Sequence, residues 1–171
     1  MIDEQTEGTK RNDEMTDEEK RDRVIRLAFG GDLQHFEEFC ATVRAELPEG
    51  TGAVLRGSAV TGVRYADGAP FDADGEGTSD LDLTLVGAKV INLFNLDGFY
   101  VPMIHSRPLS DKDPEIAPAL IPLREKLQRM VNRPVNIQAT RDFVMFLRGD
   151  IIGQPYLTLI EKTEEGESEA T

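Results

Sequence analysis

The spacing of apolar side chains predicts alternating helices and strands along most of the chain. Leu33, Phe36, Phe39 and Val43 recur at helical intervals behind Asp32, a residue type that caps helices. Similar patterns predict further helices over residues 16–27, 58–61, 90–94, 122–131 and 141–147. Short apolar or alternating runs predict strands over residues 53–55, 80–86, 99–104, 134–139 and 156–160. Strands that alternate with helices indicate one α/β (α+β) domain, with a small mixed β-sheet and helices packed against it.

Most of the net charge of −13 lies at the two ends of the chain. Residues 1–22 carry a net charge of −5 and residues 161–171 carry −4, which leaves only −4 for residues 23–160. Segments that are rich in charge and poor in apolar residues bury too little surface to fold alone. We therefore expect disordered acidic tails over residues 1–15 and 161–171, on either side of a folded domain over residues 16–160.

The composition also excludes several classes of protein. No apolar run approaches the roughly 20 residues that cross a bilayer, and acids stand where a secretory signal needs positive charge. We therefore expect a cytoplasmic protein with no membrane partner. The lone cysteine, Cys40, excludes an intrachain disulfide and a Cys-rich zinc site, and its place on an apolar helix face indicates a buried small side chain. The acidic balance disfavours nonspecific nucleic-acid binding, which depends on Lys and Arg.

The segment from Asp80 to Val86 alternates polar and apolar positions, as a half-buried strand does. Successive side chains of a strand point to opposite faces, so Asp80 and Asp82 share one face while Leu81 and Leu83 share the other. Two carboxylates held side by side repel each other unless a cation lies between them. A hard cation such as Mg²⁺, which prefers oxygen ligands, meets that need, although many exposed strands also alternate acids with apolar residues.

A second pattern lies earlier in the chain, where an apolar run ends in Gly57 and Ser58 and a short helix is predicted to begin. Glycine at such a position permits close approach of the backbone, and the free amide groups of a helix N-terminus favour phosphate. Ser58 adds a hydroxyl donor. An ordinary turn between a strand and a helix has the same residues, but a turn of this kind followed by a strand with paired carboxylates is a rarer combination.

Together these segments resemble the polymerase-beta-like nucleotidyltransferase superfamily. Its pattern is a hydrophobic strand, Gly-Ser, a short helix and a strand bearing Asp-x-Asp, and the matching residues here are Val54–Gly62 and Thr78–Leu83. The resemblance is specific over residues 53–86 and weaker elsewhere. Residues 62–77 between the two segments form a longer excursion, which looks like the form found in nucleotidyltransferase domains of bacterial toxin-like proteins. The resemblance implies a nucleotidyltransferase-like domain over residues 16–160.

The same resemblance implies a two-metal mechanism. Asp80 and Asp82 would hold two Mg²⁺ ions, and Gly57 and Ser58 would hold the β- and γ-phosphates of a nucleoside triphosphate. The enzyme would transfer a nucleoside monophosphate to a hydroxyl of an acceptor, which could be a protein, an RNA end or a small molecule, while pyrophosphate leaves. A protein partner could complete the site, since so small a domain offers limited surface for a large acceptor.

The family pattern contains a third carboxylate on a later strand, and this chain departs from it. The matching segment, Val135-Asn136-Ile137, has an amide in place of the acid. Asn136 offers a carbonyl oxygen to a metal but lacks the charge and cannot act as a carboxylate base. The missing charge could come from elsewhere in the chain, and the candidates are Asp72, Asp74, Glu76 and Asp142.

Two other readings of the chain stay open beside the active enzyme. One is a catalytically degenerate relative that binds nucleotide or a protein partner, in an antitoxin-like or regulatory role. The other is an unrelated α/β binding domain in which Asp80 and Asp82 are surface acids.

Among the remaining polar residues, we expect His35 to be solvated and His105 to lie in a loop. We also expect a solvated basic helix face, or a contact for phosphate or a partner, at Arg124, Lys126, Arg129 and Arg133.

Overall fold

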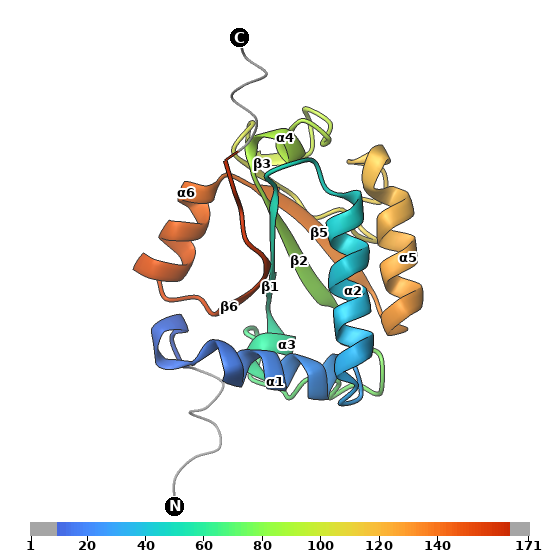
Figure 1. Ribbon diagram of the computed structural model, residues 1–171, viewed down its shortest axis with the longest axis vertical. Helices are drawn as coiled ribbons and strands as arrows, with labels where there is room; N and C mark the ends of the chain where they lie inside the picture. The colour runs from blue at the N-terminus through green and yellow to red at the C-terminus, as the bar shows by residue number, and fades with distance from the viewer. Residues whose placement is uncertain (1–9, 165–171) are drawn as a thin grey trace, which may run out of the picture.

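A computed structural model describes residues 10–164 as an α/β protein with a six-stranded mixed sheet (Figure 1). The order of strands across the sheet is β3-β4-β5-β2-β1-β6. Only β2 and β5 run parallel, and every other neighbouring pair is antiparallel. The strands are β1 (Gly52–Arg56), β2 (Leu81–Val86), β3 (Phe99–Val101), β4 (His105–Ser106), β5 (Val135–Thr140) and β6 (Tyr156–Ile160).

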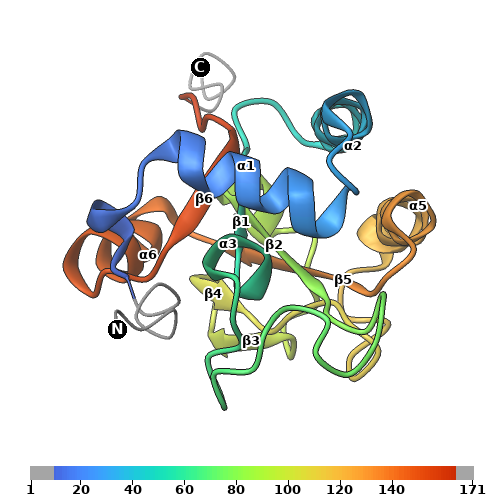
Figure 2. The ribbon, with the colours of Figure 1, turned by 90° about the horizontal axis from the view of Figure 1, so that it is seen from below.

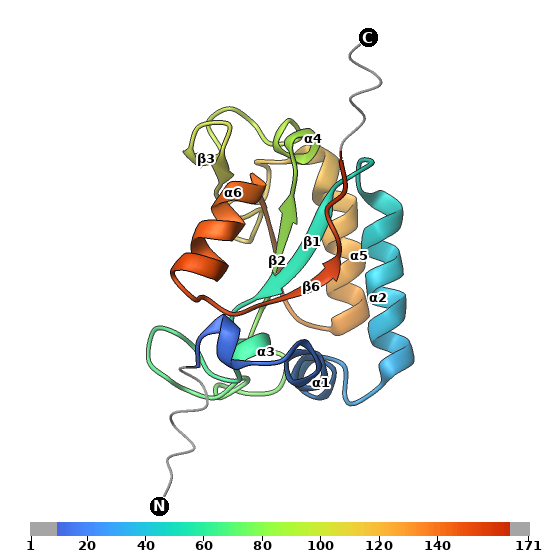
Figure 3. The ribbon, with the colours of Figure 1, turned by 60° about the vertical axis from the view of Figure 1, so that its left-hand side comes forward.

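Helices lie on both faces of the sheet, but they cover the two faces unequally. Figure 3 shows α2 and α5 side by side on one face and α6 alone on the other. In Figure 2, α1 crosses the end of the sheet next to α3. The helices are α1 (Asp17–Ala28), α2 (Leu33–Glu46), α3 (Ser58–Thr61), α4 (Ala88–Ile91), α5 (Ile121–Val131) and α6 (Asp142–Met145). The 3₁₀ turns Asn12–Glu14 and Pro118–Leu120 and a π-helical turn, η4 (Phe146–Ile151), complete the secondary structure.

The face under α2 and α5 forms the hydrophobic core. Leu81, Leu83 and Leu85 of β2 are buried there, because alternate residues of a strand point to one face. Each of them contributes on the order of 2 kcal/mol by leaving water. This burial fixes the register of β2: a slip of one residue would carry the leucines to the other face and the two aspartates into the core.

The opposite face is only partly covered. Val54 and Val86 pack there against Met145 of α6 and Tyr156 of β6. The polar residues of β2 and β5 project from the same face beyond this small cluster, and the protein therefore presents its candidate chemistry on the thinly covered side of the sheet.

The local signals for the first helices are confirmed. Thr16 caps α1 by accepting a hydrogen bond from the amide of Glu19, and Asp32 caps α2 by accepting one from the amide of His35. The strand expected over residues 99–104 is instead a hairpin of β3 and β4, with a turn at residues 102–104.

No helix in the described part of the chain combines the length and apolar character needed to span a membrane.

The predicted acidic tails are partly packed where the structure describes them. The amide of Asn12 donates to the carbonyl of Gly153, and the Arg11 guanidinium donates to the carbonyl of Ile152. At the other end, the amide of Thr163 donates to the carbonyl of Gly50. Residues 10–15 and 161–164, which were assigned to the tails, thus contact the domain through hydrogen bonds. Residues 1–9 and 165–171, which were also assigned to the tails, lie outside the described residues.

Two members of the predicted basic helix face serve the fold instead. Arg124 is buried and donates to the carbonyl of Val135 and to Asp111. Arg133 pairs with Asp72, at 2.8 Å, and stacks over the ring of Phe71. Both guanidiniums bind acids and carbonyl groups inside the domain, although Nε of Arg133 has no hydrogen-bond partner. Only Lys126 and Arg129 of the predicted basic face are exposed.

Candidate functional site

Three adjacent strands bring three polar side chains into a row. Arg56 of β1 lies opposite Asp82 of β2, and Asp82 lies beside Asn136 of β5 in the parallel pair. Residues paired in this way point to the same face of the sheet. The parity predicted for Asn136 is therefore confirmed, and the sheet order adds Arg56, which the sequence pattern had not singled out.

The amide of Asn136 bridges the two carboxylates. Its Nδ2 donates to Oδ2 of Asp80 at 2.7 Å and to Oδ1 of Asp82 at 3.2 Å. The amide hydrogens thus place partial positive charge between two negative groups. Turning the amide by 180° would present its oxygen instead, which is the atom a hard cation binds.

The pKa of Asp82 shows how unfavourable its negative charge is at this position. Burial, followed by the neighbouring charge of Asp80, raises the pKa of Asp82 to about 6. The hydrogen bond from Asn136 and the charge of Arg56 act in the opposite direction and are the weaker influences. A cation bound between the carboxylates would offset the repulsion that the folded chain leaves in place.

Gly57 makes room for the Asp82 carboxylate. A Cβ atom at this position would lie 2.6 Å from Oδ2 of Asp82, and the glycine has a φ of +83°. Both facts require glycine here: the first is a close approach and the second is a backbone conformation that other residues adopt only with strain. Ser58 follows as the first residue of α3 and is half-buried. The predicted glycine–serine turn therefore lies directly against the predicted carboxylate pair.

A cavity of about 300 Å³ adjoins the row of polar side chains. Asp82, Thr84, Asn136 and Gln138 contribute to its wall from the sheet. The remaining lining residues come from β1, from the β3–β4 hairpin and the loop after it, and from η4, and include Arg56, Tyr100, His105, Pro108 and Arg148.

His105 belongs to this cavity and not to a loop. It lies on β4 opposite Thr140. Its Nδ1 lies 2.9 Å from the hydroxyl of Thr140, while its Nε2 lies 3.3 Å from Nε2 of Gln138 and 3.4 Å from Nη1 of Arg148. Burial, followed by the charge of Arg56, lowers the pKa of His105. The expectation of a loop histidine was wrong because a strand of two residues leaves no periodic pattern in the sequence.

The four candidates for a third carboxylate lie elsewhere. Asp72 is paired with Arg133, whose hydrogen bond is the main reason that its pKa falls to about 2. Asp74 is exposed and pairs with Arg64. Glu76 and Asp142 are exposed. Within residues 10–164, no three side chains of His, Cys, Asp or Glu are grouped as a metal site. Beside Asp80 and Asp82, Asn136 is therefore the third side chain with an oxygen that could bind a metal.

His35 was expected to be solvated, and this was wrong. Its Nε2 lies 2.6 Å from the carbonyl oxygen of Met130, and its ring packs edge-on against Phe29. The imidazole thus joins α2 to the end of α5.

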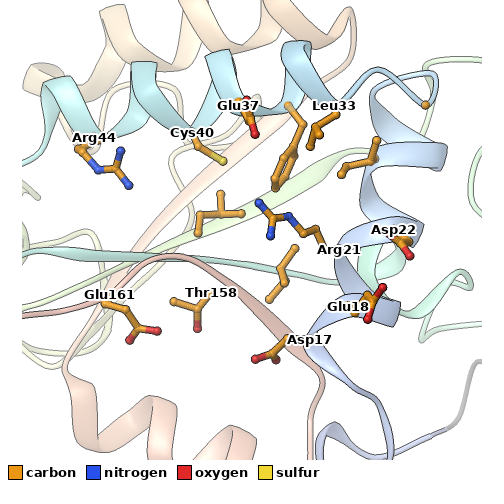
Figure 4. A pocket seen from close by; sticks show the side chains of 15 residues that line it. Asp17, Glu18, Arg21, Asp22, Leu33, Glu37, Cys40, Arg44, Thr158 and Glu161 are labelled. Atoms are coloured by element: carbon orange, nitrogen blue, oxygen red, sulfur yellow. The ribbon is translucent and has the colours of Figure 1, made fainter.

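A larger groove of about 1060 Å³ lies on the other side of the sheet, between α1, α2 and β6 (Figure 4). Its labelled acids come from α1, from α2 and from the residue after β6, and they do not converge on one point. Cys40 lines the groove and is half-buried, and burial raises the pKa of its thiol to about 11. The thiol therefore stays protonated and unreactive at neutral pH, in agreement with a packing role.

Comparison of the chain with protein-family models, curated proteins and solved structures finds no match.

Proposed function

We propose that this protein is a Mg²⁺-dependent nucleotidyltransferase, which transfers a nucleoside monophosphate from a nucleoside triphosphate to an acceptor hydroxyl. The observation that carries the proposal is the contact between two separate sequence segments: Gly57, at the start of α3, lies against the carboxylate of Asp82. The sequence resemblance to polymerase-beta-like nucleotidyltransferases rests on these same two segments. Their adjacency supports a nucleotidyltransferase-like fold for the domain.

The residues present fit a magnesium–nucleotide complex. Mg²⁺ in nucleotide sites is commonly held by one or two carboxylates together with substrate phosphates and water. Asp80 and Asp82 supply the carboxylates, and Asn136 offers its Oδ1 once the amide has turned. Burial, followed by repulsion from Asp80, raises the pKa of Asp82, and both make the carboxylate pair more favourable with a cation than without one. When bound, Mg²⁺ would neutralise the triphosphate and polarise the α-phosphate.

The chain's own residues would act by positioning. The backbone at Gly57 and Ser58 would hold the β- and γ-phosphates, and the serine hydroxyl adds a hydrogen-bond donor. Asp80 and Asp82 would hold the cation that neutralises the α-phosphate, above the face of the sheet from which they project. The acceptor oxygen then forms a bond to the α-phosphorus while the bond to the bridging oxygen breaks, and pyrophosphate leaves with that electron pair. Orientation and charge stabilisation supply most of the rate enhancement in such a mechanism.

A second candidate is a catalytically degenerate relative that binds nucleotide or a protein partner without transfer. Asn136 favours it, because an amide contributes no charge to the metal site. A protein partner would also suit α6 and η4, where four large apolar side chains are about half exposed: Phe143, Phe146, Leu147 and Ile151.

The release of pyrophosphate separates the two candidates without knowledge of the acceptor, because water can slowly take the acceptor's place. Purified protein would be incubated with Mg²⁺ and each nucleoside triphosphate, and pyrophosphate and inorganic phosphate would be measured separately. The enzyme releases pyrophosphate with one or more nucleotides, and the Asp80→Ala/Asp82→Ala variant does not. Saturable nucleotide binding without pyrophosphate release identifies the degenerate relative. Release of inorganic phosphate alone would contradict both candidates.

A further inference from the structure

Two arginines line the 300 Å³ cavity, and Asp82 is the only acid among the described residues that line it with them. Arg56 is largely buried, and its Nε and Nη1 have no hydrogen-bond partner. Arg148 donates from Nε to Oε1 of Gln154, and its Nη1 lies 3.4 Å from Nε2 of His105. Among residues 10–164, neither guanidinium forms a salt bridge. Acids outnumber bases by 32 to 19 in this chain, yet the charge of Asp82 leaves two buried nitrogens of Arg56 without a hydrogen bond. Two guanidiniums without a salt bridge at one cavity therefore indicate an anionic ligand.

The cavity lies on one side of Asp82 and the glycine–serine turn on the other. Along β2, the wall of the cavity continues from Asp82 to Thr84. Strand β1 runs antiparallel to β2, and Arg56 pairs with Asp82, so Gly57 and Ser58 lie beyond the pair in the opposite direction. A triphosphate held at the turn would therefore leave the cavity free.

In an in-line displacement, the attacking oxygen approaches the phosphorus opposite the leaving group. The positions of the cavity and of the glycine–serine turn, on opposite sides of Asp82, agree with this geometry. Under the proposed function, on which this inference rests, pyrophosphate leaves on the side of Gly57 and Ser58. The acceptor must then approach from the side of Thr84 and Gln138, where the cavity lies.

We propose that this cavity is the acceptor subsite, and that the acceptor is a small hydroxyl compound bearing a phosphate group held by Arg56 and Arg148. Guanidinium groups bind phosphate through paired, charge-assisted hydrogen bonds. A volume of about 300 Å³ suits a small molecule. The net charge of −13 opposes a polynucleotide acceptor, whose many phosphates would be repelled.

His105 supplies the acceptor for the hydroxyl proton. Thr140 donates its own hydroxyl to the carbonyl of Ile104, so Nδ1 of His105 carries the hydrogen that it donates to Thr140. The other ring nitrogen, Nε2, faces two donors, from Gln138 and Arg148, and is therefore the unprotonated one. The acceptor hydroxyl would replace these two weak donors, at 3.3 and 3.4 Å, as Arg148 turns to the phosphate and Gln138 keeps its bond to the carbonyl of Ser106. The acceptor oxygen bonds to the α-phosphorus, its proton passes to Nε2, and pyrophosphate departs.

The test is calorimetric titration of inorganic phosphate and of glycerol 3-phosphate into the full chain, with unphosphorylated glycerol as the matched probe. Wild type binds both phosphate compounds and not glycerol. The Arg148→Gln variant binds them at least about tenfold more weakly, while Arg129→Gln, which changes an exposed arginine of α5, binds as wild type does. Arg148→Gln keeps its affinity for Mg²⁺–nucleotide, because the triphosphate lies on the other side. Arg56→Gln, compared with Arg56→Lys, gives a second variant, with thermal unfolding as the check of folding.

Each contrary result has a distinct meaning. Wild type that binds Mg²⁺–nucleotide but not phosphate overturns this inference and leaves the proposed function standing. Phosphate binding without any nucleotide binding overturns the proposed function, and with it the assignment of an acceptor subsite. An equal loss of nucleotide and phosphate affinity in Arg148→Gln would move Arg148 to the triphosphate and overturn the inference. Tighter binding of a 5′-phosphorylated oligonucleotide than of glycerol 3-phosphate would overturn the assignment to a small acceptor.

Discussion

Replacing Asp82 with asparagine removes a negative charge that lowers the stability of the folded protein. The side chain is largely buried beside Asp80, and these two influences raise its pKa from an ordinary 3.8 to about 6. Asparagine has nearly the same shape, and its carbonyl oxygen can still accept the hydrogen bond from Asn136. The substitution therefore separates the charge from the packing, and we expect Asp82→Asn to be more stable than wild type at neutral pH and to lose its response to Mg²⁺.

The size and the pH dependence of the effect follow from the pKa. Because the folded-state pKa of Asp82 lies above the unfolded one, wild type loses stability as the pH rises from about 4 to about 6 and bears the full cost above that range. Each pKa unit corresponds to about 1.4 kcal/mol, so the cost at pH 7.5 is about 3 kcal/mol. For a chain of this length, that raises the melting temperature of the variant by about 5–10 °C.

Urea unfolding of both proteins at pH 4.5 and pH 7.5, with and without Mg²⁺, measures the difference directly. The variant gains stability over wild type at pH 7.5 and little at pH 4.5, where wild-type Asp82 is mostly protonated. Mg²⁺ is added at about 10 mM, which exceeds a dissociation constant on the order of 1 mM. It stabilises wild type alone, because a ligand shifts the unfolding equilibrium only when it binds the folded state. A variant that is less stable than wild type at pH 7.5, or that keeps the Mg²⁺ response, would refute the reasoning.

Three further substitutions test neighbouring parts of the account. Asn136→Asp places a third carboxylate against the two aspartates, so the variant loses about 2 kcal/mol of stability without Mg²⁺ and gains a larger Mg²⁺-dependent rise in melting temperature; an unchanged Mg²⁺ response would count against a cation at this row. Gly57→Ala puts a methyl group 2.6 Å from Oδ2 of Asp82 and costs about 1–3 kcal/mol, together with the Mg²⁺ response; thermal unfolding with wild-type stability would contradict the close approach. Asp72→Asn leaves Arg133 buried without its partner and costs about 2–3 kcal/mol in urea unfolding at pH 7. Because the pKa of Asp72 is lowered to about 2, its contribution is present above about pH 4 and is lost as the pH falls through about 2, so the difference between wild type and Asp72→Asn should vanish there.

The residues that follow from local alternation could be predicted from the sequence. In β2, the period of two places the leucines on the core face and Asp82 on the other, and Asp80, just before the strand, shares the hydrogen bonds of Asn136 with Asp82. The same parity placed Asn136 on the site side of β5, and the pairing of Asp82 with Asn136 agrees. Helix caps are equally local, which is why Thr16 and Asp32 could be assigned from a few neighbouring residues.

The residues that depend on sheet order and on distant contacts could not be predicted in this way. Arg56 joins the site only because β1 is the neighbour of β2, and Arg148 comes to the cavity from η4, more than 60 residues further along the chain than Asp82. Arg133 reads as a solvated base in a local window, whereas its partner Asp72 lies 61 residues away. No periodic pattern carries such pairings, because they are fixed by the packing of whole elements.

The central claim is that Asp80, Asp82 and the glycine–serine turn form one Mg²⁺-dependent nucleotide site. Calorimetric titration of each nucleoside triphosphate with Mg²⁺, into wild type and into the Asp80→Ala/Asp82→Ala variant, tests it most directly. The account predicts saturable binding of one or more triphosphates to wild type, which disappears when Mg²⁺ is chelated and is absent from the folded variant. Failure of all four triphosphates to bind wild type, or equal binding by the variant, would contradict the claim.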